Sequence, residues 1–223
     1  MAESYLRQSP LAHRALETRA SDEAGAAALA MTERRFSAKI GLRGEPDPDA
    51  VKRATGVALP GEPNTVAEGN NLVALWLGPQ EWLVVGPPEA ETGLAAALGE
   101  AVEGSGAAVV DVTEGRTVIR IAGPMARDVL SMGCPLDLHP RVFGPGRCAQ
   151  SFLGRSRVIL HQVDDGPTFD IYVERSQADY LWLWLETAAR PYGVAVTTEP
   201  PAGAWRRPAK RRAKASGDED GEA

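Results

Sequence analysis

The stretch Val109–Gly133, VVDVTEGRTVIRIAGPMARDVLSMG, constrains the fold more than any other part of the sequence. It predicts a strand, a turn at Glu114-Gly115, a second strand whose side chains alternate over Arg116–Ile121, and a helix. Pro124 suits the first helical position, where its missing N–H costs nothing. Gly133 is placed to end the helix in the left-handed conformation. The stretch therefore closes one folding unit and opens another.

Two similar units are predicted on either side of this junction. Residues 35–112 follow the order strand, helix, strand, strand, helix, strand, which is typical of the split ferredoxin-like arrangement. Residues 113–200 repeat this theme, with three strands between their two helices. The predicted fold class is therefore α+β, with two tandem ferredoxin-like βαββαβ units and antiparallel sheets. The strands expected in the first unit are Phe36–Leu42, Leu72–Leu77, Trp82–Val85 and Ala107–Val112, with helices after Asp47 and Thr92. Those expected in the second are Arg116–Ile121, Arg147–Leu153, Val158–Val163, Thr168–Val173 and Val194–Thr197, with helices at Pro124–Met132 and Gln177–Ala189.

The two ends of the chain are expected to lie outside these units. Residues 1–34 are polar and alanine-rich without a clean apolar stripe, and they predict an extended or partly helical N-terminal arm. Residues 201–223 form a charged tail in which six basic side chains precede four acidic ones. Such a segment has too little apolar surface to order itself, so the tail is predicted to be disordered.

Composition limits the partners and the compartment. The chain has 223 residues, 43% of them hydrophobic, which suits one or two small domains with a proper core. Its net charge of −6 does not favour nucleic acid, and no apolar run approaches the roughly 18 residues that span a bilayer. With two cysteines and no secretory signal, the thiols are expected to stay reduced and the protein to be cytoplasmic.

No group of side chains in the sequence predicts an active site. His13, His139 and His161 lie in separate elements, whereas a closed zinc site needs about four converging ligands. His161 is expected to face Asp170 across the hairpin as a structural pair. We therefore predict that this chain has no catalytic, cofactor-binding or metal-binding residues.

Three further features are interpreted as structural. Adjacent Asp164 and Asp165 suit turn geometry better than acid–base chemistry. Cys148 follows an arginine that could activate a thiol, but its strand position favours a small buried residue, and Cys134 is interpreted in the same way. The basic run after Trp205 meets its own acidic block, so a solvated tail is favoured over nucleic-acid binding.

The helix predicted at Gln177–Ala189 carries more apolar surface than one buried face requires. Either the two units sandwich this helix or a partner protein covers it. Its expected inner stripe consists of Leu181, Trp184, Leu185 and Ala188. The candidate interface residues, which lie off that stripe, are Tyr180, Trp182 and Leu183.

Five segments of the sequence resemble, in the same order, the gamma subunit of heterotetrameric sarcosine oxidase. Together they cover most of the chain from Ser9 to Thr198. They are SPLAH (Ser9–His13), TVAEGNNLVALWLGPQEWLVVGP (Thr65–Pro87), VVDVTEGRTVIRIAGP (Val109–Pro124), GCPLDLHPRVFGPGRCAQ (Gly133–Gln150) and DDGPTFDIYVERSQADYLW (Asp164–Trp182).

That family is itself similar to the folate-binding glycine-cleavage T-protein, so the resemblance implies a T-protein-like folate-binding fold. In T-proteins a glycine-rich turn leads into a strand that opens with an Asp pair, one member of which works on the folate-bound one-carbon unit. The equivalent place here falls at about Arg157-Val158, and no carboxylate lies between Gly154 and Gln162. The resemblance therefore does not extend to independent one-carbon transfer.

The resemblance implies a non-catalytic subunit that assembles with the alpha, beta and delta subunits of sarcosine oxidase. The assembled enzyme converts sarcosine to glycine, with formaldehyde or methylene-tetrahydrofolate and hydrogen peroxide as the other products. It implies that FAD, FMN and NAD lie in the alpha and beta subunits and zinc in delta, that tetrahydrofolate is a co-substrate, and that this chain holds no cofactor. The alternatives are a stand-alone folate-binding one-carbon transferase or repair protein of the T-protein superfamily, and a free-standing interaction module.

Overall fold

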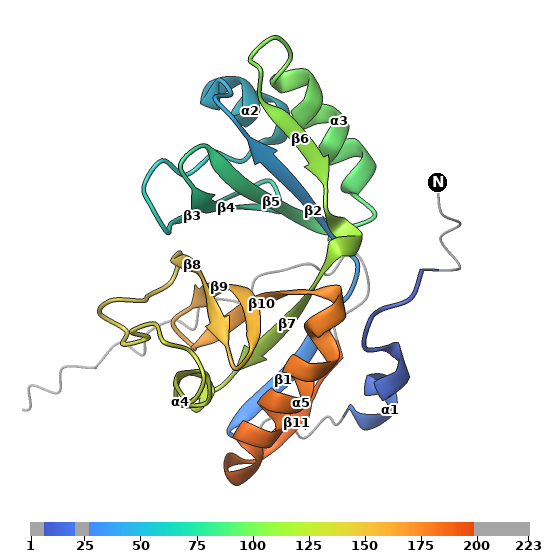
Figure 1. Ribbon diagram of the computed structural model, residues 1–223, viewed down its shortest axis with the longest axis vertical. Coiled ribbons are helices and arrows are strands. Elements are labelled where there is room, and N and C mark those ends of the chain that lie inside the picture. Colours follow the sequence, from blue (N-terminus) through green and yellow to red (C-terminus); the bar gives the residue numbers. More distant parts are fainter. Residues whose placement is uncertain (1–6, 21–26, 199–223) are drawn as a thin grey trace, which may run out of the picture.

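Two β-sheets packed face to face, with helices on their outer faces, make up residues 7–20 and 27–198, which a computed structural model describes (Figure 1). The first sheet has the order β3-β4-β5-β2-β6 and the second the order β11-β1-β7-β10-β9-β8. All neighbouring strands are antiparallel except β1 and β11, which are parallel. The fold is therefore mixed α+β with antiparallel sheets, as predicted.

The first sheet and its helices follow the predicted order closely. The elements are β2 Ser37–Arg43, α2 Pro48–Thr55, β3 Val66–Gly69, β4 Leu72–Gly78, β5 Glu81–Pro88, α3 Glu91–Ala101 and β6 Ala108–Asp111. The sequence signals for α2 are confirmed. The side chain of Asp47 accepts a hydrogen bond from the Asp49 N–H, and Gly56 ends the helix with a φ of 80°. β3 is not among the predicted strands, because the loop rich in Pro, Gly and Asn that contains it has no strand signal.

The second sheet contains the other predicted strands and one that was not expected. The elements are β1 Leu29–Arg34, β7 Arg116–Ala122, α4 Ala126–Ser131, β8 Cys148–Leu153, β9 Ser156–Asp164, β10 Thr168–Glu174, α5 Ala178–Ala189 and β11 Val194–Val196. The short helix α1 is Leu16–Arg19. Single helical turns lie at Ala12–Arg14, Thr113–Gly115, Arg175–Gln177 and Arg190–Tyr192.

The predicted N-terminal arm is wrong over Leu29–Arg34. These residues form β1, which lies between β7 and β11 inside the second sheet. Leu29 and Met31 are fully buried in the core beneath α5, and they are the only large apolar side chains of an alanine-rich stretch. Because two such residues make no visible stripe, the alternation that defines the strand was not recognised.

Three clusters of apolar side chains hold the layers together. One lies between the first sheet and its helices and includes Ile40, Val51, Val84 and Leu98. The second lies between the second sheet and α4 and α5 and includes Ile119, Phe169, Leu181 and Trp182. The third joins the two sheets through Leu75, Leu83, Val85, Val118, Ile159 and Tyr172.

Gly133 does not have the predicted left-handed conformation. It is required for packing instead, because a Cβ at this position would lie 2.4 Å from Cζ2 of Trp184. The glycine therefore lets the loop after α4 approach the indole ring of α5. The predicted tail, residues 201–223, lies outside the described residues. Among the helices of residues 7–20 and 27–198, none is long and apolar enough to cross a membrane.

Candidate functional site

Helix α5 buries a different face from the one predicted. Its buried residues are Ala178, Leu181, Trp182, Leu185 and Ala189, which recur at spacings of three and four. Trp182 is 0% exposed, so its placement off the core stripe is wrong, and it is no longer a candidate for contact with a partner. Tyr180 and Leu183 are 37% and 52% exposed, and their role at an interface remains a prediction.

The exposed side of α5 is fixed against the turn between β8 and β9. The Tyr180 hydroxyl accepts a hydrogen bond from the Arg155 N–H at 3.2 Å. Trp184, which is half-buried, fits against Gly133 and Gly154, whose missing side chains leave room for its ring. Tyr180, Leu183 and Trp184 lie at the helical spacings that share one face, and Met132, beside Gly133, is 52% exposed. These four residues form an apolar surface that we call the α5 patch.

The opposite flank of α5 is covered by this chain itself. Leu11 is fully buried and Leu16 nearly so, which anchors the N-terminal segment. The Asp179 carboxylate accepts from Arg14 Nε at 2.6 Å and lies 2.6 Å from the Nε2 of His13. The hydrogen bond from Arg14 is the main reason that the pKa of Asp179 is held below its ordinary value. The segment therefore closes one side of the helix and leaves the α5 patch open.

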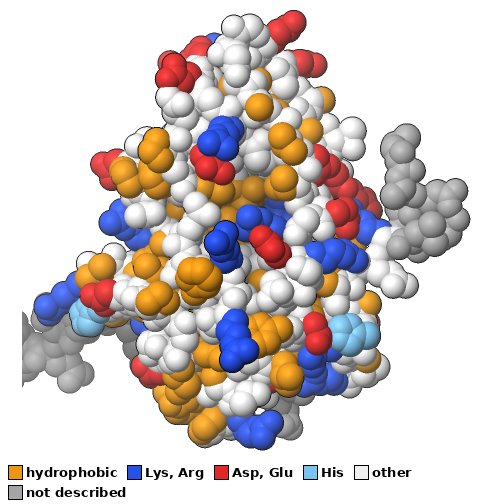
Figure 2. Space-filling view, viewed as in Figure 1, with side chains coloured by type: hydrophobic (Ala, Val, Ile, Leu, Met, Phe, Trp, Pro, Cys, Tyr) orange, Lys and Arg blue, Asp and Glu red, His pale blue; other side chains and the backbone are white. Residues whose placement is uncertain are grey.

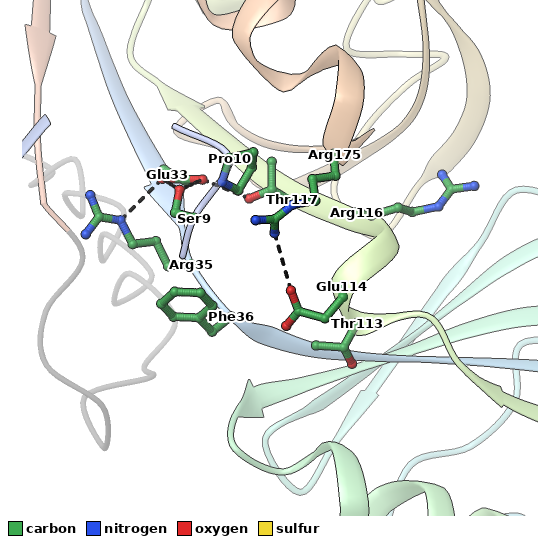
Figure 3. A pocket seen from close by; sticks show the side chains of 10 residues that line it. All are labelled: Ser9, Pro10, Glu33, Arg35, Phe36, Thr113, Glu114, Arg116, Thr117 and Arg175. Atoms are coloured by element: carbon green, nitrogen blue, oxygen red, sulfur yellow. Dashed lines mark hydrogen bonds and ion pairs between the residues drawn. The ribbon is translucent and has the colours of Figure 1, made fainter. Parts of the chain in front are cut away.

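A small polar pocket marks where the N-terminal segment crosses the connection between the sheets (Figure 3). The buried Glu33 carboxylate accepts from the hydroxyls of Ser9 and Thr117, and Arg35 Nε lies 3.2 Å from it. Figure 3 shows Arg175 directed at Glu114, with a distance of 3.3 Å between Nη1 and Oε2. The cavity measures about 10 Å³, the size of one water molecule, so this pocket fastens the segment and does not hold a ligand.

Lys39 of β2 is buried close to this connection. It is 1% exposed, and its ammonium group donates to the Ser37 carbonyl. Burial lowers the pKa of Lys39 to about 8, and the nearby positive charge of Arg7 adds to the effect, whereas Glu114, Glu91 and Asp111 oppose it. This burial cannot be predicted from the sequence, because alternation in β2 shows which face Lys39 occupies but not what covers that face.

A row of polar side chains crosses the face of the second sheet that is turned to the first. Asp170 Oδ2 lies 2.8 Å from Arg34 Nη1, and Arg120 contacts both oxygens at 2.6 and 2.7 Å. Burial alone would raise the pKa of Asp170, but Arg120 and Arg34 outweigh it and hold the pKa well below its ordinary value. His161 is paired with Asp170 across the hairpin, as predicted. The row is a buried ion-pair network within the sheet.

The two cysteines are buried, as the sequence indicates. Cys148 is 0% exposed, and its thiol lies 3.4 Å from the Thr65 carbonyl and 3.3 Å from that of Trp76. Burial raises the pKa of the Cys148 thiol to about 12, which makes the nucleophilic thiolate scarce at neutral pH. Cys134 is 7% exposed and belongs to the core beneath α5.

The position equivalent to the Asp pair of T-proteins, predicted at about Arg157-Val158, lies at the start of β9. The turn before it contains Gly154 with a φ of 58°, and the strand opens with Ser156 and Arg157. The Arg157 guanidinium lies 5.9 Å from the ring centre of Phe152. At the other end of the strand, the Asp164 side chain accepts from the N–H groups of Gly166 and Thr168, so it serves the turn as expected. Among the described residues, no group of three or more His, Cys, Asp or Glu side chains is arranged to hold a metal ion.

Comparison with known proteins gives consistent matches. Residues 45–190 match the model of the sarcosine oxidase, gamma subunit family. The sarcosine oxidase subunit gamma of Corynebacterium sp. (strain U-96) is 34% identical over 196 residues, or 86% of this chain and 94% of that protein. The subunit gamma of an Arthrobacter species is 38% identical over 161 residues, or 70% of this chain and 76% of that protein.

Solved structures agree with this assignment. A chain of heterotetrameric sarcosine oxidase from Corynebacterium sp. U-96 superposes with a TM-score of 0.74 and 33% identity, over 84% of this chain and 96% of that one. The glycine cleavage system aminomethyltransferase T from Bartonella henselae has a TM-score of 0.66 but 13% identity, over 86% of this chain and 59% of that one, so it shares the fold alone. With the family model covering more than half of its residues, this chain belongs to the sarcosine oxidase gamma subunit family.

Proposed function

We propose that this chain is the non-catalytic gamma subunit of a heterotetrameric sarcosine oxidase, an oxidoreductase. The observation that carries the proposal is the match to a chain of an assembled heterotetrameric sarcosine oxidase, which includes 96% of that chain at 33% identity. Because the match spans almost the whole of the other chain, it supports the same place in an assembly and not only the same fold.

We propose that the two sheets correspond to two tandem ferredoxin-like units. In the first sheet, β2, β4, β5 and β6 follow the order 2-3-1-4, with β3 added at the edge.

The lack of a catalytic role is supported by the start of β9. In the T-protein-like version of this fold, an acid–base carboxylate is expected at the start of β9. Here that place holds Arg157, whose guanidinium lies against Phe152. A cation cannot accept the proton that one-carbon chemistry on folate requires.

The proposed partners are the alpha, beta and delta subunits. FAD, FMN and NAD are assigned to alpha and beta and zinc to delta, with tetrahydrofolate as the co-substrate of the complex. The reaction would be the oxidative demethylation of sarcosine to glycine, giving hydrogen peroxide and formaldehyde or methylene-tetrahydrofolate. The proposed location of the complex is the cytoplasm.

The α5 patch is the surface that we propose for contact with a partner subunit. Tyr180, Leu183 and Trp184 present apolar area on a helix whose other flank the N-terminal segment already covers. Exposed apolar side chains that share one helix face are typical of a protein–protein contact. A leucine buried at such a contact contributes about 1.5–3 kcal/mol.

The test is co-expression of this chain with alpha, beta and delta subunits, followed by size-exclusion chromatography and sarcosine oxidation assays. Leu183→Glu is expected to reduce the yield of the four-subunit complex. Val142→Glu is the matched control, because Val142 is 53% exposed and Leu183 is 52% exposed. A wild-type chain that elutes alone while the other three subunits form an active enzyme would contradict the proposal. If that chain instead bound tetrahydrofolate and transferred its one-carbon unit, the transferase alternative would hold.

A further inference from the structure

Three of the four sheet edges make backbone contacts with other parts of this chain. At one side, β3 and β8 begin by pairing with each other: the Val66 N–H donates to Gly146 O at 2.9 Å and the Cys148 N–H to Asn64 O at 3.0 Å. At the outer edge of the second sheet, β11 forms a bridge between Val196 and Ala20. Edges are closed in this way because unpaired strand edges recruit other chains.

The fourth edge, β6, has no such cover among the described residues. β6 pairs only with β2, in a regular antiparallel register that places Val110 opposite Gly41. The Val112 N–H points to β2, where it donates to Lys39 O, so alternation turns the backbone groups of Val109 and Asp111 outward. β6 has no proline, lysine or bulge, the usual devices that protect an edge. Its side chain Val110 is 55% exposed.

A hollow lies beside this edge, on the face of the first sheet that is turned to the second. It measures about 340 Å³, which is within the range of specific binding pockets. Gly41 leaves space in its floor, and Leu77, Leu83 and Val110 supply apolar walls. In Figure 2, hydrophobic side chains gather at the middle of the molecule between the two halves, with basic and acidic side chains around them.

The charged residues that line the hollow are two cations and one carboxylate. Arg43 and Arg116 line it together with one acidic residue, Glu81. Within residues 7–20 and 27–198, neither arginine has a hydrogen-bond or ion-pair partner. Most other arginines near the junction of the sheets are paired; Arg175, for example, contacts Glu114. In the strand register Arg43 lies opposite Glu81 and Arg116 lies opposite Glu174, although neither arginine makes a direct ion pair. Beside an apolar hollow, these two guanidinium groups are complementary to a carboxylate next to an apolar side chain.

We propose that an extended segment of a partner subunit docks here by adding a strand to β6. Its backbone would pair with Val109 and Asp111, an apolar side chain would enter the hollow beside Val110, and an adjacent Asp or Glu would meet Arg43 or Arg116. This is strand addition, in which main-chain hydrogen bonds give affinity and a side-chain pocket gives specificity. The inference rests on the proposed function as a subunit of an assembly, and it identifies a second contact surface, apart from the α5 patch.

Filling the hollow is the sharpest test. Gly41→Leu is expected to fold, because φ at Gly41 is not in the positive region and a Cβ there would have Val110 O as its nearest neighbour, at an ordinary 3.6 Å. Removing a strand glycine should maintain or raise the melting temperature. In the co-expressed complex, the same variant should weaken assembly by roughly 30-fold, because it occupies the space of a central anchor residue.

Matched variants separate docking from folding. Gly99→Ala in α3 also removes a glycine, at a position with nothing within 4 Å, so it should stabilise the chain and leave assembly unchanged. Arg43→Glu should weaken assembly, while Arg147→Glu should not. A photo-crosslinking amino acid at Val110 should attach to a partner subunit, in a segment where an apolar residue neighbours Asp or Glu.

The outcomes distinguish this proposal from the proposed function. If Gly41→Leu assembles with wild-type affinity, the hollow is not occupied and the inference is wrong, although the chain remains a subunit. If Val110 crosslinks to a second copy of this chain, the occupant is a copy and the proposed partner is wrong. If the wild-type chain does not assemble at all, the proposed function fails first.

Discussion

Replacing the buried Lys39 by methionine should stabilise this protein at neutral pH. Lys39 is 1% exposed, and its ammonium group donates to the Ser37 carbonyl, with no carboxylate of the described residues in salt-bridge contact. The ordinary pKa of 10.5 falls to about 8, mainly because of burial. At about 1.4 kcal/mol for each pKa unit, the folded state bears a cost of about 3 kcal/mol for keeping this charge. Methionine has a similar length and carries none.

The sign of the pH dependence follows from these two values. Below pH 8 both states of Lys39 are protonated, so the folded protein bears the whole cost. Between pH 8 and 10.5 the folded protein has released the proton and the unfolded chain has not, so the free energy of unfolding rises with pH. Lys39→Met should lack this rise. Its gain at pH 7 is about 2 kcal/mol, after the lost hydrogen bond to Ser37 removes about 1 kcal/mol.

Urea-induced unfolding of wild type and Lys39→Met at pH 7, 9 and 10 is the measurement. At pH 7 the variant should have the higher free energy of unfolding, and this difference should shrink almost to nothing by pH 10. Cys148, whose pKa of about 12 makes stability fall as pH rises above its ordinary value of 9, affects both proteins equally and cancels in the comparison. The reasoning would be refuted if the variant were less stable than wild type at pH 7, or if the difference in the free energy of unfolding did not change with pH.

Four other changes have definite expected outcomes. Asp170→Asn should cost about 3–5 kcal/mol in denaturant unfolding, because it leaves the buried guanidinium of Arg34 and the half-buried one of Arg120 uncompensated. Since those groups depress the pKa of Asp170, the stability that the carboxylate adds is present above its unfolded value of 3.8 and should be lost in acid melts below it. Trp182→Ala should lower the stability of the isolated chain by about 3–5 kcal/mol. An effect confined to assembly would contradict its core position. Gly133→Ala should cost about 1–3 kcal/mol and shift the fluorescence of Trp184, which its Cβ would displace. Deleting Arg206–Ala223 should leave the melting temperature of the complex almost unchanged, and a drop of many degrees would show that the tail is ordered there.

The contrast between Trp182 and Trp184 shows where sequence reasoning stops. Successive helical residues are about 100° apart, so the two tryptophans lie symmetrically on either side of the stripe defined by Leu181 and Leu185. Pattern alone cannot choose between them. The choice is made by Gly133 and the turn after β8, which accept the edge of Trp184 and leave Trp182 to fill the core.

Local patterns were nevertheless sufficient for much of the fold. The pairing of His161 with Asp170 could be predicted from the position of the hairpin turn. The irregularity between Thr168 and Phe169, which places Thr168 opposite Asp164, could not be predicted. The two arginines that neutralise Asp170 could not, because Arg34 lies 136 residues away in the chain, on a strand that was not recognised. Long-range ion pairs leave no periodic signal, and the buried charges of this protein are of that kind.

The position of β1 sets the order in which the protein can be completed as it is made. All strands of the first sheet lie between Ser37 and Asp111, so that sheet can close early. β1 can pair with β7 on one side, but its other side must wait for β11, and the Thr32 and Thr197 hydroxyls that meet at that seam are 165 residues apart. At ribosomal rates this delay is on the order of 10 s. During that interval the core that Leu29 and Met31 enter is incomplete, because α5, which covers it, is also made late. We therefore expect β1 to be a segment of the nascent chain that a chaperone can bind.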